Sequence, residues 1–407
     1  MGNILTQIDN KNQMISFIYD QINRLEMKDY DSPNMKDIVY TYDNLDPPNS
    51  IGRLSSVSDG VNDTSYEYDK EGRVIKVKRI VDGNTYVTST TMMTGPNNLN
   101  NLSRQRNRNL YYDSNSGLLE SIIPSPQGGE GQGEGASAYV DSITYNAAGQ
   151  ILNIKYGNNT ETSYTYGNDQ RLQHILTTDN GQLTTIQDLS YNFDKAGNLK
   201  TLTDNLEERS RSYRYDSLNR LIRAEGIPDE LGGYSTYTYQ YDAIGNMTYK
   251  SDVGAYTHNA GNAGPHAVTT AGGYTFTYDD NGNMTYGRGK TFTYDSENRV
   301  IEVDNLGQIT TFEYNHNGNR IRKASPDAIT TYISKLYEVS EQDDVTVSKK
   351  HIFAGQTRVC TITTTLSPDG GEGQGEGGSA THYYHTDHLG SSNIITDETG
   401  TEVQHLE

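Results

Sequence analysis

The sequence Tyr215-Asp216-Ser217-Leu218-Asn219-Arg220-Leu221 decides the fold of this chain. Asp is favoured at the first position of a type I turn, and Asn readily takes the left-handed conformation that closes such a turn into a hairpin. A second Tyr lies two residues before Tyr215, and an aliphatic residue follows the turn, so both strands place apolar groups on one face. The segment therefore predicts one β-hairpin.

The Tyr-Asp pattern recurs along the chain, with Gly or Asn three residues after the Asp. Further copies are Tyr19-Asp20, Tyr68-Asp69 with Gly72, Tyr241-Asp242 with Gly245, Tyr278-Asp279 with Gly282, and Tyr294-Asp295. Two copies have longer turns, Tyr42-Asp43 and Tyr112-Asp113, and looser copies begin at Tyr145, Phe193 and Tyr314. Regular copies follow one another after 21 to 26 residues. This period predicts a stacked array in which each unit covers only its neighbours.

The composition favours a sheet ribbon over compact globules. The 407 residues are 33% hydrophobic and include 32 Tyr but no Trp. Tyr combines an apolar ring with a polar hydroxyl, so we expect a β-surface that borders water and not a dry core. Low aliphatic content is also typical of disorder, but regularly spaced Tyr pairs and turns favour order. We predict an all-β fold of repeated antiparallel hairpins.

The charge balance excludes some partners. The chain has 33 Lys and Arg against 53 Asp and Glu, a net charge of −20, and no basic face that a nucleic-acid binder needs. No membrane span or signal peptide is recognisable, so we expect export to be directed by sequence outside this chain. Cys360 is the single cysteine, which excludes an internal disulfide.

We expect one array over residues 1–407 that is a fragment at both ends, because Met1–Thr6 matches the second half of a unit. Two nearly identical Gly- and Glu-rich segments, 125–137 and 367–379, interrupt it. Gly at this density forms neither helix nor strand, so both are predicted to be loop insertions at hairpin tips. Residues 380–407 then form the end of the array.

The repeats, together with the sequence Tyr383-Tyr384-His385-Thr386-Asp387-His388-Leu389-Gly390-Ser391, resemble the YD-repeat (Rhs) family. Its members include bacterial polymorphic toxins, cocoon-forming subunits of insecticidal Tc toxins, wall-associated proteins and teneurins. The resemblance implies a hairpin ribbon wound in a spiral, forming a complete or partial shell around a C-terminal toxin or other cargo. It also implies that Asp387, His388 and Gly390 form a structural motif.

The chain departs from the self-cleaving members of that family after Ser391. Those members continue into a region that carries the acidic residues of an autoprotease, and this sequence stops at Glu407 without that region. Self-cleavage therefore transfers to no residue of this chain. The resemblance implies no cofactor and no metal.

An enzymatic alternative depends on His382, His385, Asp387 and His388. In an extended strand His385 and Asp387 share a face, which is one way to supply metal ligands or an acid and base pair. Their spacing matches no closed zinc pattern, however, and the family resemblance already explains Asp387 and His388. The sequence therefore favours a protein that is not an enzyme.

Two functions remain open from the sequence. The first is a non-enzymatic structural segment of a secreted or surface YD-repeat protein, part of a β-shell that encapsulates a toxin or other cargo polypeptide. The second is a surface adhesion or glycan-binding module, because exposed Tyr-rich strands can stack on sugars. A glycan-array screen separates the two.

Overall fold

The structure is a computed structural model that describes residues 2–32, 35–46, 48–60, 62–81, 83–89, 108–112, 118–124, 138–228, 233–366 and 378–406. These residues form strands β1 to β35 and no helix, which confirms the predicted all-β fold. Neighbouring strands in the sequence pair antiparallel as hairpins. The chain divides into two compact units, and each is described by itself.

Unit 1 comprises residues Met1–Thr91, Tyr256–Ser348 and Thr365–Gly377. Its first part is a meander of eight strands, in which each pairs with the next. These strands are β1 (Thr6–Ile8), β2 (Met14–Tyr19), β3 (Leu25–Tyr30), β4 (Ile38–Tyr42), β5 (Leu54–Ser58), β6 (Asp63–Tyr68), β7 (Val74–Val81) and β8 (Asn84–Ser89).

The second part of unit 1 continues the hairpin pattern. Its strands are β22 (Val268–Ala271), β23 (Tyr274–Tyr278), β24 (Met284–Gly287), β25 (Lys290–Tyr294), β26 (Val300–Asn305), β27 (Gln308–Tyr314), β28 (Arg320–Ala324), β29 (Ile329–Ser334) and β30 (Tyr337–Gln342). Tyr256 pairs with Ala271 across β21 (Gly254–His258) and β22, so a degenerate hairpin lies in the long gap before Tyr278.

Unit 2 comprises residues Met92–Ala255, Lys349–Thr364 and Gly378–Glu407. Its strands are β9 (Arg108–Tyr112), β10 (Leu119–Pro124), β11 (Val140–Tyr145), β12 (Ile151–Tyr156), β13 (Thr160–Tyr166), β14 (Leu172–Asp179), β15 (Thr184–Phe193), β16 (Leu199–Asp204), β17 (Arg209–Tyr215), β18 (Leu221–Pro228), β19 (Tyr234–Tyr241), β20 (Met247–Lys250), β33 (Ser379–Thr386), β34 (Ser392–Thr396) and β35 (Glu402–His405). The strands β31 (Val345–Ala354) and β32 (Thr357–Leu366) contain residues of both units.

The hairpin turn has the geometry that the sequence predicts. The Asn219 amide donates to the Asp216 carbonyl at 3.0 Å, and the Asp216 amide donates to the Arg220 carbonyl at 2.9 Å. Asn219 has a φ of +60°, and the strand register shifts at Tyr215, as in a type I turn closed by a bulge. The Asp216 carboxylate also accepts from the amides of Leu218 and Arg220, at 2.9 and 3.0 Å. The same turn recurs at Asp20, Asp69, Asp242, Asp279 and Asp295.

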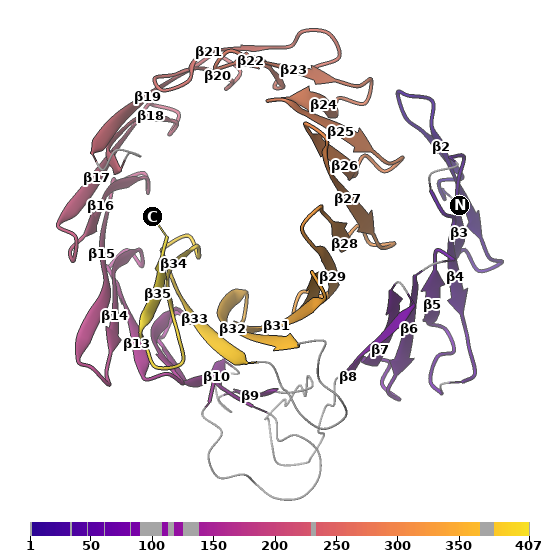
Figure 1. Cartoon of the computed structure of the whole chain (residues 1–407), viewed down its shortest axis with the longest axis horizontal. Coiled ribbons are helices and arrows are strands. Elements are labelled where there is room, and N and C mark those ends of the chain that lie inside the picture. The colour runs from indigo at the N-terminus through magenta and orange to yellow at the C-terminus, as the bar shows by residue number, and fades with distance from the viewer. Residues whose placement is uncertain are drawn as a thin grey trace, which may run out of the picture. The chain divides into compact units, whose positions relative to one another are not determined.

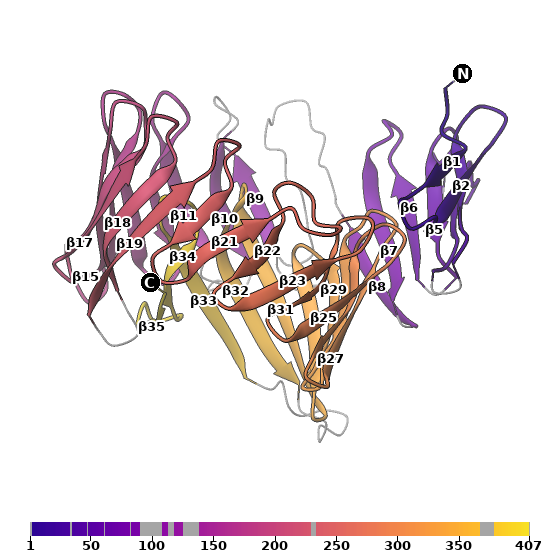
Figure 2. The ribbon, with the colours of Figure 1, turned by 90° about the horizontal axis from the view of Figure 1, so that it is seen from above.

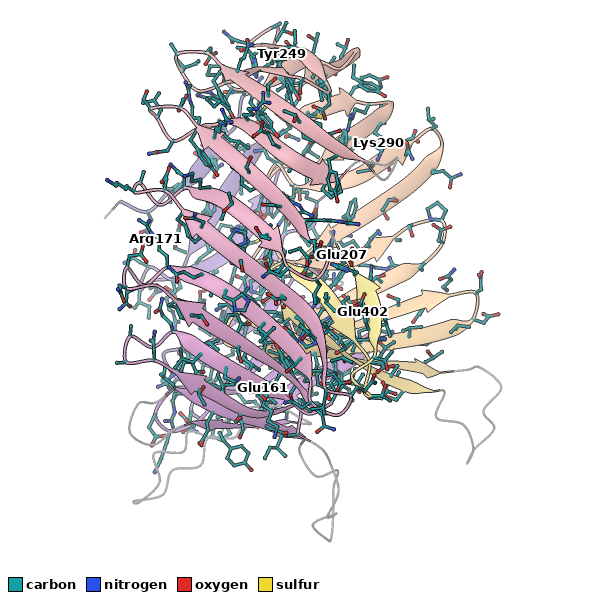
Figure 3. The ribbon with its side chains drawn as sticks, turned by 90° about the vertical axis from the view of Figure 1, so that its left-hand side faces the viewer. Glu161, Arg171, Glu207, Tyr249, Lys290 and Glu402 are labelled. Atoms are coloured by element: carbon teal, nitrogen blue, oxygen red, sulfur yellow. The ribbon has the colours of Figure 1, made fainter. Side chains whose placement is uncertain are left out.

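In unit 2 these turns lie along one edge of the sheet. Arg171 follows the turn between β13 and β14, whereas Glu207 lies in the turn between β16 and β17 at the opposite end of the strands (Figure 3). Strands β15 to β19 follow one another in the sheet, each paired with the next (Figures 1 and 2). Described turns of this unit therefore contact their neighbours, as Arg220 contacts the Asp242 carbonyl and Asn198 contacts Asn219.

Unit 2 has a dry core, contrary to the sequence-based expectation of a sheet bordering water. Ile122, Val140 and Val359 are fully buried, and Tyr156 and Tyr383 pack with them. The reason is that C-terminal strands cover one face of the sheet, so Tyr rings on that face pack against protein. In unit 1 a smaller cluster forms around Ile15, Tyr30, Ile38 and Val57.

The two Gly- and Glu-rich segments fall outside the described residues, apart from Gly378 and Ser379 of the second. Ser379, which the sequence assigned to a loop, is the first residue of β33. Tyr112 ends β9, while Asp113 also falls outside the described residues. The predictions for the loops and for the turn after Tyr112 stay predictions.

Candidate functional site

In the Tyr-Asp pairs whose side chains the structure describes, the Tyr joins its hairpin to the preceding strands. The Tyr215 hydroxyl donates to the carbonyl of Leu199, the first residue of β16, at 2.9 Å. Tyr42, Tyr68, Tyr145, Tyr166, Tyr241, Tyr278, Tyr294 and Tyr314 make the equivalent bond to Leu25, Leu54, Leu119, Ile151, Leu221, Val268, Met284 and Val300. Tyr19 donates to Ile4, just before β1. The sequence predicted a hydroxyl facing water, whereas these hydroxyls satisfy backbone acceptors.

The residue four positions after the turn Asp provides a second link. The Arg220 Nε atom donates to Asp216 Oδ2 at 2.7 Å, and its Nη1 donates to the Asp242 carbonyl of the next turn at 3.0 Å. The same guanidinium lies 4.8 Å from the Tyr241 ring centroid. Arg24 and Arg299 also contact both their own turn and the next Tyr ring. Each hairpin is thereby held to its successor through side chains as well as through the strand ladder.

Hydrogen bonds keep the carboxyl group of Asp216 in its ionised form. Backbone and side-chain hydrogen bonds from Arg220 lower the pKa of Asp216 below its ordinary value. Burial raises the pKa of Tyr215 and Tyr241, so these phenols stay neutral and donate. Asp43 differs from the other turn residues, because it has a φ of +59° and receives Arg24 from the preceding hairpin at 2.7 Å.

The C-terminal hairpins pack across the face of the sheet in unit 2, as β33 to β35 do against β12 to β15 (Figure 1). The Tyr156 ring makes edge contacts with the rings of Tyr383 and His385, with centroids 6.2 and 4.9 Å apart. The Asn158 side-chain amide donates to Thr396 Oγ1 at 2.9 Å and to the Asp397 carbonyl at 2.8 Å. These residues are more than 200 positions apart in the sequence, so units of this array contact more than their neighbours.

A buried polar network lies at this interface. His385 is fully buried, with Nε2 3.0 Å from Thr396 Oγ1 and Nδ1 3.4 Å from Thr162 Oγ1. The network continues from Thr162 through Thr177 to Gln187, whose amide donates to Asn393 at 2.9 Å. Both ring nitrogens of His385 thus lie near hydroxyl groups, which can donate or accept as the neutral ring requires.

Burial lowers the pKa of His385 to about 3. The imidazole is therefore neutral at physiological pH and has no access to solvent, which makes it unsuited to exchange protons with a substrate. Asp387 is not on the strand face of His385, because β33 ends at Thr386 and Asp387 opens the following turn. The proposed grouping of His385 with Asp387 is wrong. Among the described residues, no group of three or more His, Cys, Asp or Glu is placed to hold a metal ion.

His388 and Gly390 complete the turn between β33 and β34. Gly390 has a φ of +82°, and its amide donates to the Asp387 carbonyl at 3.2 Å. The His388 ring lies 4.7 Å from the ring of Tyr191 on β15, and burial lowers its pKa. His382 lies on β33.

Sequence reasoning missed the residues that receive these hairpins. Thr160, Thr162 and Thr177 are fully buried on β13 and β14, with Asn158 and Gln187 beside them. The alternation of Thr160 and Thr162 on β13 was the available signal. The alternation alone does not predict a contact with β33, because β13 and β33 are far apart in the sequence and meet only in the folded unit.

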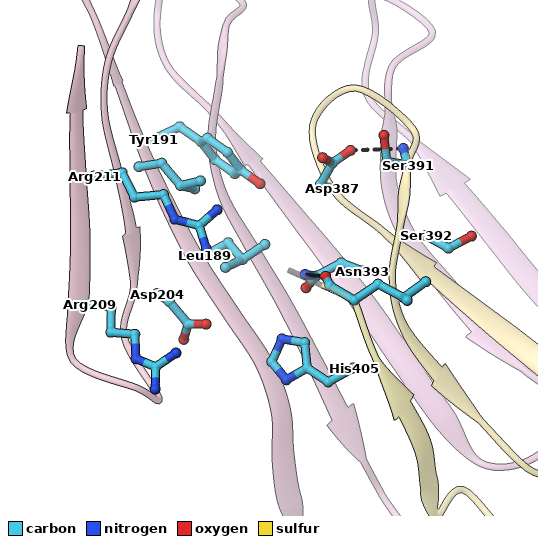
Figure 4. Close-up of a pocket in the computed structure, with 12 residues that line it drawn as sticks. Leu189, Tyr191, Asp204, Arg209, Arg211, Asp387, Ser391, Ser392, Asn393 and His405 are labelled. Carbon is cyan, nitrogen blue, oxygen red and sulfur yellow. Dashed lines mark hydrogen bonds between the residues drawn. The ribbon is translucent and has the colours of Figure 1, made fainter. Parts of the chain in front are cut away.

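A cavity of about 240 Å³ lies between β15 to β17 and the C-terminal hairpins (Figure 4). Leu189 and Leu202 form its apolar part, together with Leu406. Arg211 and Asp387 are among the charged residues that line it. The cavity lies wholly within unit 2.

Comparisons with known proteins agree with this architecture. A family model described as the teneurin YD-shell matches residues 181–407, more than half of the chain. The chain belongs to this family. The matched residues contain β15 to β35 and so include the C-terminal hairpins, whereas Thr162 and Thr177 of the buried network lie before them.

Two curated YD-shell relatives come from Yersinia entomophaga. Toxin subunit YenC2 is 32% identical over 168 residues, which cover 32% of this chain and 17% of that protein. Toxin subunit YenC1 is 31% identical over 184 residues, which cover 37% of this chain and 18% of that protein. These proteins are similar to this chain over about a third of it.

Solved structures share the fold over nearly all of the chain. The crystal structure of TcdB2-TccC3-Cdc42 matches with a TM-score of 0.78 at 17% identity, over 99% of this chain and 23% of that one. The Photorhabdus luminescens Tc holotoxin pore matches with a TM-score of 0.76 at 18% identity, with the same coverage. This chain spans about a quarter or less of the length of each relative.

Proposed function

We propose that this chain is a non-enzymatic structural segment of a secreted or surface YD-repeat protein, and that it forms part of a β-shell that encapsulates a toxin or other cargo polypeptide. Membership of the teneurin YD-shell family is the observation that carries the proposal. The relatives are named as toxin subunits, which supports a toxin as the cargo.

The mechanism is a mechanical one. A wall that excludes proteases must not open between neighbouring strands, and an unreinforced strand pair opens readily at its ends. In this chain many hairpins have a Tyr hydroxyl bond to the preceding hairpin, such as Tyr241 to Leu221 at 2.8 Å. Arg220 adds a contact to the next turn. These links support a barrier function, because they lie where a sheet otherwise opens first.

The role needs no reactive side chain. His385 is buried and neutral, and Cys360 is fully buried. The described residues contain no helix long and apolar enough to cross a membrane. Asp residues of the Tyr-Asp motif, such as Asp216 and Asp295, bind the backbone of their own turns, which supports a structural assignment for the motif.

Protease protection of a passenger tests the proposal. A small unfolded passenger polypeptide is fused after Glu407, and its half-life under thermolysin is measured. The control is the same passenger mixed with the chain without a covalent link. We expect fusion to lengthen the half-life at least tenfold, because unfolded polypeptide held at a protein wall is removed from the protease. Equal half-lives in the two arrangements contradict the proposal.

A glycan-binding module is the second candidate, and exposed aromatic residues favour it. Tyr234 is 59% exposed, and Tyr274 and Tyr286 are 47% and 42% exposed. Phenol rings on a sheet surface can stack on the apolar face of a sugar. A glycan array is screened with the chain and with Tyr234→Ala, Tyr274→Ala and Tyr286→Ala. Specific binding that these changes abolish supports adhesion, whereas uniform absence of binding excludes it.

A further inference from the structure

Asp387 lacks the Oδ2 partner that many turns of the repeat supply, as does Asp397 in the following turn. In seven turns the residue four positions later donates a side-chain hydrogen bond to the Asp Oδ2 atom. These donors are Arg24, Arg73, Arg220 and Arg299, and the amides of Asn198, Asn246 and Asn283. After Asp387 that position is Ser391, whose backbone amide binds Oδ1 at 2.9 Å. Among the described residues, no donor binds Oδ2 of Asp387.

This carboxylate lies at the edge of the 240 Å³ cavity described above. Figure 4 shows Asp387 on the side of the C-terminal turn and Arg211 on the opposite side, with its guanidinium directed into the space between them. No carboxylate of the described residues lies within ion-pair distance of Arg211. The cavity thus has a hydrogen-bond acceptor on one wall and an unpaired cation on the other.

The Tyr191 side chain adds a third polar group. Tyr191 is 5% exposed and lines the cavity, yet its hydroxyl has no hydrogen-bond partner. The hydroxyl lies close to the His388 backbone amide without hydrogen-bond geometry. A buried hydroxyl without a partner costs about 1–3 kcal/mol. A ligand or water in the cavity would remove this cost.

The rest of the lining combines three leucines with polar residues, among them Asp204, Ser392 and His405. Leu189 is 5% exposed, and it lies beside Leu202 and Leu406. A volume of 240 Å³ is below the roughly 300–1,000 Å³ of sites for drug-sized ligands, so the ligand is small. Its chemistry must combine a donor for Asp387, an acceptor for Arg211 and an aliphatic group for the leucines.

We propose that the cavity between β15 to β17 and the C-terminal hairpins binds one aliphatic amino-acid residue. The N–H group of that residue donates to Asp387 Oδ2, and its carbonyl or carboxylate oxygen accepts from the Arg211 guanidinium. Its side chain packs on Leu189 and Leu202. The residue is either a free amino acid or part of a polypeptide, and the polypeptide source rests on the proposed cargo function.

Ligand-observed NMR titration tests the proposal with two probes, free L-leucine and N-acetyl-L-leucine N-methylamide. We expect the chain to bind at least one probe below about 10 mM. Binding of the blocked probe alone assigns the site to a polypeptide, and binding of free leucine alone assigns it to the zwitterion. Either result supports the proposal, and absence of binding by both probes overturns it.

Two substitutions test the residues of the site. Arg211→Gln removes the cation, and Asp387→Asn keeps the turn acceptor Oδ1 while replacing Oδ2 with a donor. Each is expected to weaken binding about tenfold or more, the effect of one charge-assisted hydrogen bond. Arg214→Gln is the matched control, because Arg214 is on the same strand with a side chain 69% exposed. Binding that both site variants retain overturns the proposal.

A direct ion pair of Arg211 with Asp387 in solution is the competing explanation. It predicts that neither probe binds and that the two substitutions are coupled in the free energy of unfolding, and this result overturns the proposal. The titration is independent of the passenger assay. A chain that binds leucine without protecting a passenger refutes the cargo function alone.

Discussion

The turns at Asp216 and Asp387 have the same backbone but different attachments. In both, the Asp Oδ1 atom accepts from the amides two and four residues later. At Asp216 the hairpin is then linked to its neighbours by Arg220, which donates to the Asp242 carbonyl at 3.0 Å, and by Tyr215, which donates to the Leu199 carbonyl at 2.9 Å. At Asp387 the residues in those positions are Ser391 and Thr386, and neither makes an equivalent bond.

The difference shows that this repeat separates turn formation from hairpin attachment. Asp and Gly or Asn are sufficient to form the turn wherever they occur. In the regular array, neighbouring hairpins are attached side by side along one edge of the sheet, through Tyr hydroxyl bonds and Arg contacts. The C-terminal hairpins are instead attached face to face, through Tyr156, Tyr383 and the His385 network. The three predictions below test whether these two forms of attachment differ in strength and in pH dependence.

The largest expected effect is at the face-to-face interface. Tyr156→Ala should lower the free energy of unfolding of unit 2 by about 3–5 kcal/mol, because it removes a buried aromatic ring and leaves a cavity. Tyr156 is 2% exposed and contacts both Tyr383 and His385. Urea denaturation followed by tyrosine fluorescence measures the change. Tyr234→Ala, at a site 59% exposed, is the control and should change stability by less than about 0.5 kcal/mol. If the two substitutions lower the free energy of unfolding equally, the interface does not stabilise unit 2.

The second effect is the part of the pH dependence that comes from His385 in the C-terminal hairpins. The folded pKa of His385 is about 3, below the ordinary value of 6.5, so the unfolded chain binds a proton first as the pH falls. The contribution of neutral, buried His385 to the free energy of unfolding is therefore constant above pH 6.5. It decreases by about 1.4 kcal/mol per pH unit as the pH falls from 6.5 towards 3. His385→Gln should remove that slope, as measured by urea denaturation between pH 6 and 4. His266→Gln, at an exposed site, should keep it. A variant slope equal to that of the unchanged chain refutes the prediction.

The smallest effect is at a lateral link of the regular array. Tyr215→Phe keeps the ring but removes the hydroxyl that donates to the Leu199 carbonyl, which should cost about 1 kcal/mol of unfolding free energy. Local hydrogen exchange at β16 and β17 should rise with it. Tyr234→Phe removes an exposed hydroxyl for which the described residues provide no acceptor, so it should leave both measurements unchanged. If Tyr215→Phe is as costly as Tyr156→Ala, the distinction between the two attachments is wrong.

Much of the local structure could be predicted from the sequence, because turn chemistry acts over five residues. The hairpins at Asp69, Asp242 and Asp295 and their left-handed closing residues follow from this short-range rule. The chemistry of the Tyr hydroxyl could not be predicted in the same way. Its acceptor lies 10 to 26 residues earlier in the chain, as for Tyr278 with Val268 and Tyr145 with Leu119, so it depends on how hairpins are packed.

The sequence by itself determined the all-β fold, the positions of most turns and the family resemblance, since each depends on residue types at fixed short spacing. Only the tertiary structure decided that Thr162, Gln187 and His385 form one buried network, that Asp387 lies in a turn away from His385, and that Arg211 faces it across a cavity. These contacts join residues about 180 to 220 positions apart. Such pairs are set by the packing of whole strands, and no local spacing encodes them.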